Sequence, residues 1–424
     1  MTLVLKDKLI QWRRDFHQHP ELGFLEMRTA SIVAQTLNEL GIDFEIGTSV
    51  MDPNYVMGKP SDEETKAHYL WAKAHGAVEV YLDDLKDGYT GIVATIDTNK
   101  AGPTTAFRVD MDALPIYEAE HDSHVPVKEG FRSINNDMHA CGHDVHTSIG
   151  LGLATLVQER KDELSGIIKI IFQPAEEGTR GARSMAEKGI VDDVDYLIAS
   201  HIGTGVPMNH FLGSNNGFLA TTKINVTFKG VSAHAGGNPE QGKNAMLAAA
   251  NAVINLNAIP RHSEGATRVN VGELHAGSSR NAIADFASLK MEIRGTTSEI
   301  NDYMRSYAES IIKGAAEMFQ VEYTLETVGE GRSAKGDTTL AEIVTQAAQS
   351  NGLETTIEED KPSGSEDATF LINRVQEKGG QATYSIFGTE LKAGHHNENF
   401  DIDEDSMLPA VNTLFDTAKR LSTQ

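Results

Sequence analysis

The chain has 424 residues, of which 40% are hydrophobic and 23% are charged, and this composition excludes an intrinsically disordered protein. A chain of this length is too long for one ordinary hydrophobic core, so it favours two domains. The formal net charge of −24 excludes a general nucleic-acid binder, because a phosphate backbone would be repelled over most of such a surface.

The first residues do not have the pattern of a targeting signal. Residues 1–16 (MTLVLKDKLIQWRRDF) place basic side chains among apolar ones, and no uninterrupted apolar stretch follows them. No window of the sequence reaches the roughly 20 apolar residues that a membrane-spanning helix needs. A single cysteine allows no internal disulfide bond, which agrees with a reducing compartment. We therefore expect a cytoplasmic protein.

The first predicted elements are two amphipathic helices. Apolar residues recur at near-helical spacing over 5–16, and Pro20 prevents this helix from continuing much further. A second periodic stretch over 26–40 ends at Gly41, a residue type that commonly follows the last helical turn. Residues 51–89 are rich in acidic side chains, and we interpret them as an inserted helical segment with a solvated face.

Four short β-rich stretches each lead into polar residues. Helical patterns separate several of them, and this alternation is typical of an α/β sheet that is buried on both faces. The carboxyl ends of parallel strands meet at one edge, beside the crevice where such sheets bind ligands. We therefore predict a catalytic domain with a central mixed, mostly parallel sheet flanked by helices. The four strands are expected over 105–109, 166–172, 196–200 and 382–388, with helices over 147–160 and 179–188.

The pattern changes after Gly217. The expected order of elements there is strand, helix, two strands, helix and strand, which is the ferredoxin-like arrangement. Because the strand over 382–388 lies beyond this module, we predict that the module is inserted into a discontinuous catalytic domain. The predicted catalytic domain comprises 1–218 and 330–424, and the inserted lid or dimerisation domain comprises 219–329. Its elements are expected over 221–229, 244–257, 268–274, 287–294, 300–319 and 321–326.

Residues 138–147 (MHACGHDVHT) concentrate side chains that bind metals. They contain the only cysteine of the chain, three histidines and an aspartate. Thiolate and imidazole bind borderline-soft divalent cations well. Gly142 lets the backbone bend so that Cys141 and His143 reach one ion. A buried free cysteine beside solvated histidines is the weaker interpretation, because so many of these residues are close together.

A hydrolytic metal site needs ligands, an open position for water and a base that takes the proton of that water. In the Glu176–Glu177 pair, one carboxylate can bind a metal while its neighbour acts as the general base. Asp110 or Asp112 adds a further ligand or orients one. The candidate ligands are one thiolate, one carboxylate and three imidazoles, from Cys141, His143, Glu177, His201 and His396.

Several motifs, which occur in the expected order along nearly the whole chain, resemble the M20 metallopeptidase and amidohydrolase family. The closest branch contains N-acyl-amino-acid and indole-acetyl-amino-acid hydrolases. The motifs are RRDFHQHPELGF at 13–24, DMDALP at 110–115, HACGHDVHT at 139–147, QPAEEG at 173–178 and SAHA at 232–235. The acidic insert and residues 172–183, 363–369 and 387–398 are similar in particular to hydrolases that act on p-aminobenzoyl-glutamate.

The resemblance implies one or two divalent metal ions, with manganese preferred and zinc as the alternative. It implies that Glu176 is the general base. The implied ligands are Cys141, His143, Glu177, His201 and His396. Between His395 and His396 the residues alone do not choose firmly, and we favour His396 because Asn397 after it continues the family pattern.

The resemblance also implies roles for residues of the inserted module. His234 would reach the active site of a partner chain and help to hold the oxyanion. Asn281 and Arg294 would face the substrate carboxylate. Each of these side chains by itself is of an ordinary type for its position, so their roles depend on the resemblance.

The activity that the resemblance implies is that of a metal-dependent amidohydrolase acting on carbon–nitrogen bonds other than peptide bonds. The expected substrate is p-aminobenzoyl-glutamate, a folate breakdown product, which is cleaved to p-aminobenzoate and glutamate. Other N-acyl-amino acids or dipeptides are alternative substrates, and a catalytically idle regulatory subunit is an alternative of another class. The working unit is expected to be a homodimer or a heterodimer with a paralogous B subunit. The sequence leaves the role of the 51–89 insert open.

Overall fold

The computed structural model describes residues 2–360 and 364–423, and in it the chain forms two compact units. The first unit comprises Met1–Gly217, Ala334–Pro362 and Asp367–Gln424, and the second comprises Phe218–Ser333 and Ser363–Glu366. The sequence did not indicate that Ser363–Glu366 belongs to the second unit. Residue 363, the first of the 363–369 motif, lies outside the described residues. Among the described helices, none is long and apolar enough to cross a membrane.

The first unit contains an eight-stranded sheet with the order β1-β2-β4-β3-β5-β12-β6-β11. Strands β4, β3, β5 and β12 are neighbours and run parallel, whereas β2 and β6 run antiparallel to them. The prediction of a mixed, mostly parallel sheet is confirmed. The strands are β1 (Asp43–Ile46), β2 (Ile92–Asp97), β3 (Thr104–Asp110), β4 (Ile167–Gln173), β5 (Tyr196–Ile202), β6 (His210–Asn215), β11 (Glu354–Glu359) and β12 (Gln381–Phe387).

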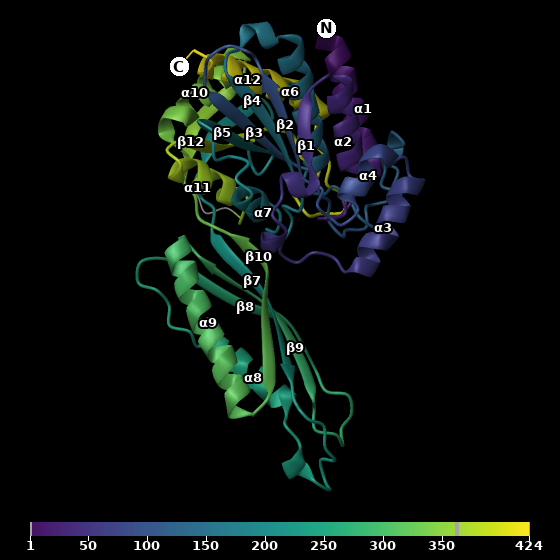
Figure 1. Cartoon of the computed structure of the whole chain (residues 1–424), viewed down its shortest axis with the longest axis vertical. Helices are drawn as coiled ribbons and strands as arrows, with labels where there is room; N and C mark the ends of the chain where they lie inside the picture. The colour runs from purple at the N-terminus through teal and green to yellow at the C-terminus, as the bar shows by residue number, and fades with distance from the viewer. Residues whose placement is uncertain (1, 361–363, 424) are drawn as a thin grey trace. The chain divides into compact units, whose positions relative to one another are not determined.

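Helices flank this sheet (Figure 1). Helices α1, α6 and α12 pack against one another, and α6 and α12 contact β3, whereas α7 and α11 pack together and α11 contacts β5 and β12. Both faces of the central strands are therefore buried, and all seven residues of β3 are buried. The helices are α1 (Thr2–Gln18), α2 (Met27–Glu39), α3 (Asp62–Ala74), α4 (Glu79–Leu85), α5 (Val125–Lys128), α6 (His143–Glu159), α7 (Ala182–Glu187), α10 (Thr338–Ser350), α11 (Thr369–Glu377) and α12 (Met407–Leu421).

Helix α6 begins four residues before the predicted start at residue 147, so His143 and His146 lie in its first turn. The polar residues of the metal-binding motif interrupt the apolar periodicity there, and this hid the start of the helix. Strands β1, β6 and β11 and helices α10, α11 and α12 were not singled out from the sequence. Strand β11 (ETTIEE) is polar and lies at a sheet edge, so it lacks the apolar run of a central strand.

The acidic insert is helical, as predicted. Helix α3 begins with a capping box, in which the Ser61 side chain accepts the N–H of Glu64 and the Glu64 side chain accepts the N–H of Ser61. The acidic residues of its first turn are exposed. On the other side of the helix, Tyr69 and Trp71 pack against the core of the first unit.

The second unit has the predicted β-α-β-β-α-β order. Its four strands form an antiparallel sheet with the order β10-β7-β9-β8, which is the ferredoxin-like topology. Helices α8 and α9 cover one face, and the alternating side chains of β7 and β9 that point toward them form the core. The elements are β7 (Ala220–Lys229), α8 (Ala245–Asn257), β8 (Thr267–Ala276), β9 (Phe286–Gly295), α9 (Ser298–Met318) and β10 (Glu322–Gly331).

Candidate active site

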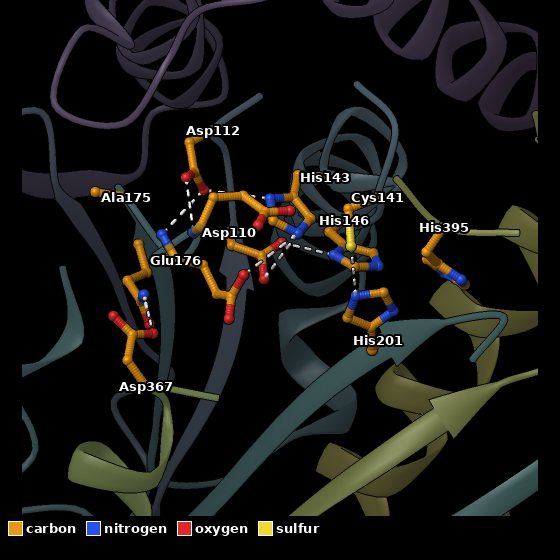
Figure 2. Close-up of polar contacts among 12 residues, drawn as sticks. Asp110, Asp112, Cys141, His143, His146, Ala175, Glu176, His201, Asp367 and His395 are labelled. Carbon is orange, nitrogen blue, oxygen red and sulfur yellow. Dashed lines mark hydrogen bonds and ion pairs between the residues drawn. The ribbon is translucent and has the colours of Figure 1, made fainter. Parts of the chain in front are cut away.

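The predicted ligands of the first unit lie at the shared carboxyl edge of β4, β3, β5 and β12. Asp110 is the last residue of β3, the Glu176–Glu177 pair follows β4, and His201 is near the end of β5. Figure 2 shows side chains from these strands and from the start of α6 directed toward one another. The topology therefore brings together residues that are far apart in the sequence.

Gly142 sets the geometry at the start of α6. Its φ of 92° lies in the left-handed region, and a Cβ added to it would lie 2.8 Å from Cγ2 of Ile202. A residue with a side chain is disfavoured here both by the backbone conformation and by the lack of space. With this bend between them, Cys141 and His143 belong to one group of possible metal ligands.

The ligand atoms of the predicted residues form overlapping groups. Within each group, the atoms lie within 4.8 Å of one another. Sγ of Cys141 is 3.5 Å from Nε2 of His201, and Oε1 of Glu177 is 3.2 Å from Nε2 of His396. Because the groups share members, they make one continuous site. The groups are Cys141 with His143 and His201, Cys141 with Glu177 and His396, and His143 with Glu176 and Glu177.

The hydrogen bonds of the histidines fit a divalent cation. Nδ1 of His143 lies 3.2 Å from Oδ1 of Asp112, so Nδ1 carries the proton in the neutral ring. Nε2 of His143 is buried and has no hydrogen-bond partner among the described residues. In His201, Nδ1 donates to the carbonyl of Ile202 at 2.7 Å. Both rings therefore present an Nε2 lone pair to the site, which is the arrangement that metal-binding histidines need.

The thiol of Cys141 is the soft donor of the site. Burial, and then the negative charge of Glu177, raise the pKa of this thiol. A divalent cation beside the sulfur would oppose both effects and favour the thiolate, which is the form that binds metals.

The contacts of His146 differ from those of His143, although the two lie on the same turn of α6. Its Nδ1 is 2.6 Å from Oδ1 of Asp110, and its Nε2 accepts the backbone N–H of Ile202 at 2.9 Å. Both ring nitrogens are in use, so His146 links β3, α6 and β5. The sequence analysis named His143 and not His146 as a candidate ligand, but it did not reveal the partners of His146, because these come from distant strands.

Asp110, which the sequence offered as a ligand or as an orienting residue, is held by contacts at both of its oxygens. Burial works against its ionisation, but the charges of His143 and Arg108 hold the pKa of Asp110 well below its usual value. Its Oδ2 accepts from the guanidinium of Arg108 at 2.7 Å. With one oxygen bound to Arg108 and the other to His146, the Asp110 carboxylate is held in one orientation.

The Glu176–Glu177 pair lies on a turn that Asp112 holds. The two oxygens of Asp112 accept the backbone N–H groups of Glu176 and Glu177 at 3.0 and 2.9 Å, as Figure 2 shows in part. Ala175 before them has a φ of 50°, a left-handed conformation that costs a non-glycine residue about 1 kcal/mol. Oε2 of Glu176 lies 3.9 Å from Nε2 of His143. Asp112 therefore orients both an imidazole and the acidic pair.

His395 and His396 both reach this site but have different surroundings. Hydrogen bonds to Cys141 and Glu177 raise the pKa of His396 to about 10. The ring of His395 lies 5.4 Å from the ring of His201, and burial lowers the pKa of His395 to about 4. Among the described residues, His396 belongs to one of the candidate ligand groups and His395 to none.

The predicted residues of the second unit can be described within that unit. Nδ1 of His234 accepts the N–H groups of Gly236 and Gly237 at 3.1 and 2.9 Å, so in the neutral ring Nε2 carries the proton and is a donor. The carbonyl of Asn281 accepts the N–H of Ala235, which places Asn281 beside His234. Arg294 lies on β9 and pairs with Glu292 at 3.1 Å.

The sequence pattern of Peptidase family M20/M25/M40 matches residues 106–420. The chain belongs to this peptidase family. The resemblance that the motifs indicated is therefore confirmed, and membership of this hydrolase family supports a hydrolase that acts on an amide bond.

Relatives match nearly the whole chain. It is 51% identical to the indole-3-acetyl-aspartic acid hydrolase of Enterobacter agglomerans, over 98% of this chain and 96% of that protein. It is 49% identical to the A subunit of p-aminobenzoyl-glutamate hydrolase from Escherichia coli, with the same coverage. The crystal structure of an aminobenzoyl-glutamate utilization protein from Klebsiella pneumoniae is 42% identical, with a TM-score of 0.87 over 99% of this chain and 97% of that one.

Proposed function

We propose that the chain hydrolyses the amide bond of p-aminobenzoyl-glutamate and releases p-aminobenzoate and glutamate. The observation that carries this proposal is the position of Glu176 beside an imidazole nitrogen, Nε2 of His143, which is buried and open to a metal. Two relatives at about half identity support the substrate class, because both are named for hydrolysis of an acyl group from an acidic amino acid.

The proposal includes a divalent metal, with manganese preferred and zinc as the alternative, as one ion or two. A bound cation supplies Lewis-acid polarisation of a carbonyl oxygen and lowers the pKa of water. The fit of the donors supports this assignment, because thiolate, imidazole and carboxylate lie together at one edge of the sheet. The residues that would hold the metal are Cys141, His143, Glu177, His201 and His396.

Other residues of the chain transfer the proton, stabilise the oxyanion and bind the substrate. Glu176 takes a proton from the attacking water and gives it to the amine nitrogen of the departing glutamate. The Nε2–H of His234, contributed by a partner chain, donates to the oxyanion of the tetrahedral intermediate. Asn281 and Arg294 bind a substrate carboxylate, and the planar guanidinium suits a two-point contact with it.

The test of the proposed function compares the purified, metal-loaded protein with its Glu176→Ala variant. Release of p-aminobenzoate is followed by chromatography, and metal content is measured by mass spectrometry. We expect the variant to keep its metal and to lose turnover by about three orders of magnitude or more. A metal-replete variant with a near-normal rate would refute the role of Glu176.

A second candidate substrate is an N-acyl-aspartate. The two identities of 51% and 49% are too close to choose between indole-acetyl-aspartate and aminobenzoyl-glutamate. A panel that crosses the two acyl groups with glutamate, aspartate and an apolar amino acid separates the candidates. A preference for the apolar amino acid would favour the general N-acyl-amino-acid hydrolases instead.

The proposed working unit is a dimer formed through the second unit. Strand β8 lies at an edge of its sheet, and edge strands offer unpaired backbone groups to another chain. Nearby apolar side chains are exposed, including Ile254 (71%), Phe286 (47%) and Leu274 (43%). One relative is named as the A subunit of its hydrolase. We infer either a homodimer or a heterodimer with a paralogous B subunit.

Light scattering of the purified chain, with and without its paralogue, tests the assembly. Activity measured on the same samples tests the alternative of an idle regulatory subunit. The proposed location is the cytoplasm, where a reducing environment would keep Cys141 as a thiol. Fractionation of cells with an antibody against the chain tests that location.

A further inference from the structure

The geometry points to Glu26 as a positioning residue for the Glu176–Glu177 pair, acting through the backbone N–H of Ala175. This inference depends on the proposed function, because it assigns a purpose to the turn that carries the proposed base. It concerns the segment after the HPE motif at residues 19–21, to which the mechanism above gives no role.

The turn after β4 is held by three consecutive backbone N–H groups. Ala175 donates to Oε1 of Glu26 at 2.8 Å, while Glu176 and Glu177 donate to the two oxygens of Asp112. Two buried carboxyl groups of the chain itself therefore accept all three N–H groups.

Ala175 is the residue of this turn that most needs support. Its φ of 50° is left-handed, and Thr179 a few residues later has a φ of 61°. A non-glycine residue keeps such a conformation only when its surroundings over-determine it. The Glu26 carboxyl supplies the acceptor for its N–H, and without that acceptor the group would be buried without a partner.

Glu26 is itself fixed from a second side. Its Oε2 accepts the hydroxyl of Thr90 at 2.6 Å, and the residue is fully buried. Thr90 directly follows the acidic insert, so the end of that insert holds the carboxyl in place. Burial, and then the charge of Asp112, raise the pKa of Glu26 to about 8.

Gly23 provides an independent contact between the same segment and the turn. A Cβ added to Gly23 would lie 2.2 Å from Nη2 of Arg180, 2.8 Å from Cβ of Ala175 and 3.0 Å from Cα of Ala175. Such a close approach has no room for a side chain. Residues 23–26 therefore contact Ala175 both by van der Waals packing and by a hydrogen bond, and both contacts act on the residue before Glu176.

Two substitutions at Glu26 separate hydrogen bonding from other effects. In Glu26→Gln the amide oxygen still accepts from Ala175, and the amide nitrogen can donate to Thr90. Glu26→Ala removes the acceptor. We expect the glutamine variant to keep at least about a third of the wild-type kcat. We expect the alanine variant to lose about 10-fold to 100-fold in kcat, with KM and metal content within about threefold of wild type.

Glu21→Ala is the matched control. Glu21 is also a fully buried glutamate next to the start of α2, but its carboxylate accepts the N–H groups of Arg28 and Thr29 and not those of the turn. It should lower the thermal midpoint without a comparable loss in kcat. Gly23→Ala is a second test, because its added Cβ crowds both the Arg180 guanidinium and Ala175 while Glu26 is intact, and it should also lower kcat more than KM.

The outcomes are separable. The kcat losses of Glu26→Ala and Glu21→Ala are compared relative to the loss in thermal midpoint of each variant. If Glu26→Ala lowers kcat no more than Glu21→Ala on this basis, Glu26 is only a structural residue and the inference is wrong. An inactive Glu26→Gln variant with normal metal content would also overturn it. If Glu176→Ala, assayed in parallel, keeps its rate, the proposed function has failed and not the positioning of the turn.

Discussion

Asp112 and His143 form a buried pair, with Oδ1 of Asp112 lying 3.2 Å from Nδ1 of His143. The exposed fractions of the two residues are 1% and 0%. The same carboxylate accepts the N–H groups of Glu176 and Glu177. One side chain therefore determines which nitrogen of His143 faces the proposed metal and how the acidic pair is presented.

Replacing Asp112 should weaken metal binding. In Asp112→Ala, His143 loses the acceptor that fixes its tautomer, and two N–H groups of the turn lose theirs. We expect metal affinity to fall about 10-fold to 100-fold, the usual effect of removing a residue that orients a ligand. Competition with a coloured chelator measures the affinity. The control is Asp97→Ala, which replaces an exposed aspartate at the end of β2. This variant should leave the metal affinity unchanged.

Gly142→Ala should destabilise the first unit by about 2 to 4 kcal/mol, because it combines a left-handed φ with a steric clash against Ile202. The free energy of unfolding from urea titration checks this. Gly352 also has a left-handed φ, of 83°, but a Cβ there meets nothing within 4 Å. Gly352→Ala should therefore cost only about 1 kcal/mol. Equal losses in the two variants would show that the clash is relieved without cost.

The stability of the first unit should fall as pH rises from about 6.5 to 9. Burial alone would lower the pKa of His17, but hydrogen bonds to Asp144 and Glu118 outweigh it and raise the pKa to about 9. A group with a raised folded-state pKa contributes its full stability below the unfolded value of 6.5 and loses it as pH passes the folded value.

His17→Gln is the variant that isolates this contribution. The wild type should lose about 2 to 3 kcal/mol more than the variant over that pH range, as the size of the pKa shift implies. Urea unfolding at several pH values gives the difference. If the free energies of unfolding of the two proteins changed with pH in the same way, the charged state of His17 would be contradicted.

Metal affinity should rise with pH. His396 has a pKa of about 10 in its contacts with Cys141 and Glu177, and the pKa of the Cys141 thiol is also raised. A cation must displace protons from both groups, so the apparent affinity should increase by up to about tenfold per pH unit for each proton released. Titrations from pH 6 to 8 measure the slope, and His396→Ala should make it shallower. A slope independent of pH would count against both residues as ligands.

The sequence by itself determined the family and the fold class, and it supplied the candidate residues for the proposed chemistry. Apolar strands bounded by polar residues indicated a buried sheet with reactive side chains at one edge, because the period and length of apolar runs depend on local sequence. The ferredoxin-like order of the second unit was visible for the same reason. The edge strand β11 was missed, because its polar sequence has no apolar run.

Only the tertiary structure decided how the individual groups are used. His143 and His146 belong to one short motif, yet one presents a nitrogen to the site and the other is bound on both sides by Asp110 and Ile202. Glu26 gave no signal beyond the start of a helix, although its carboxyl reaches Ala175 from 149 positions away. The proton positions and orientations of such groups depend on partners from distant strands, and it is the folded sheet that brings those partners within hydrogen-bonding distance.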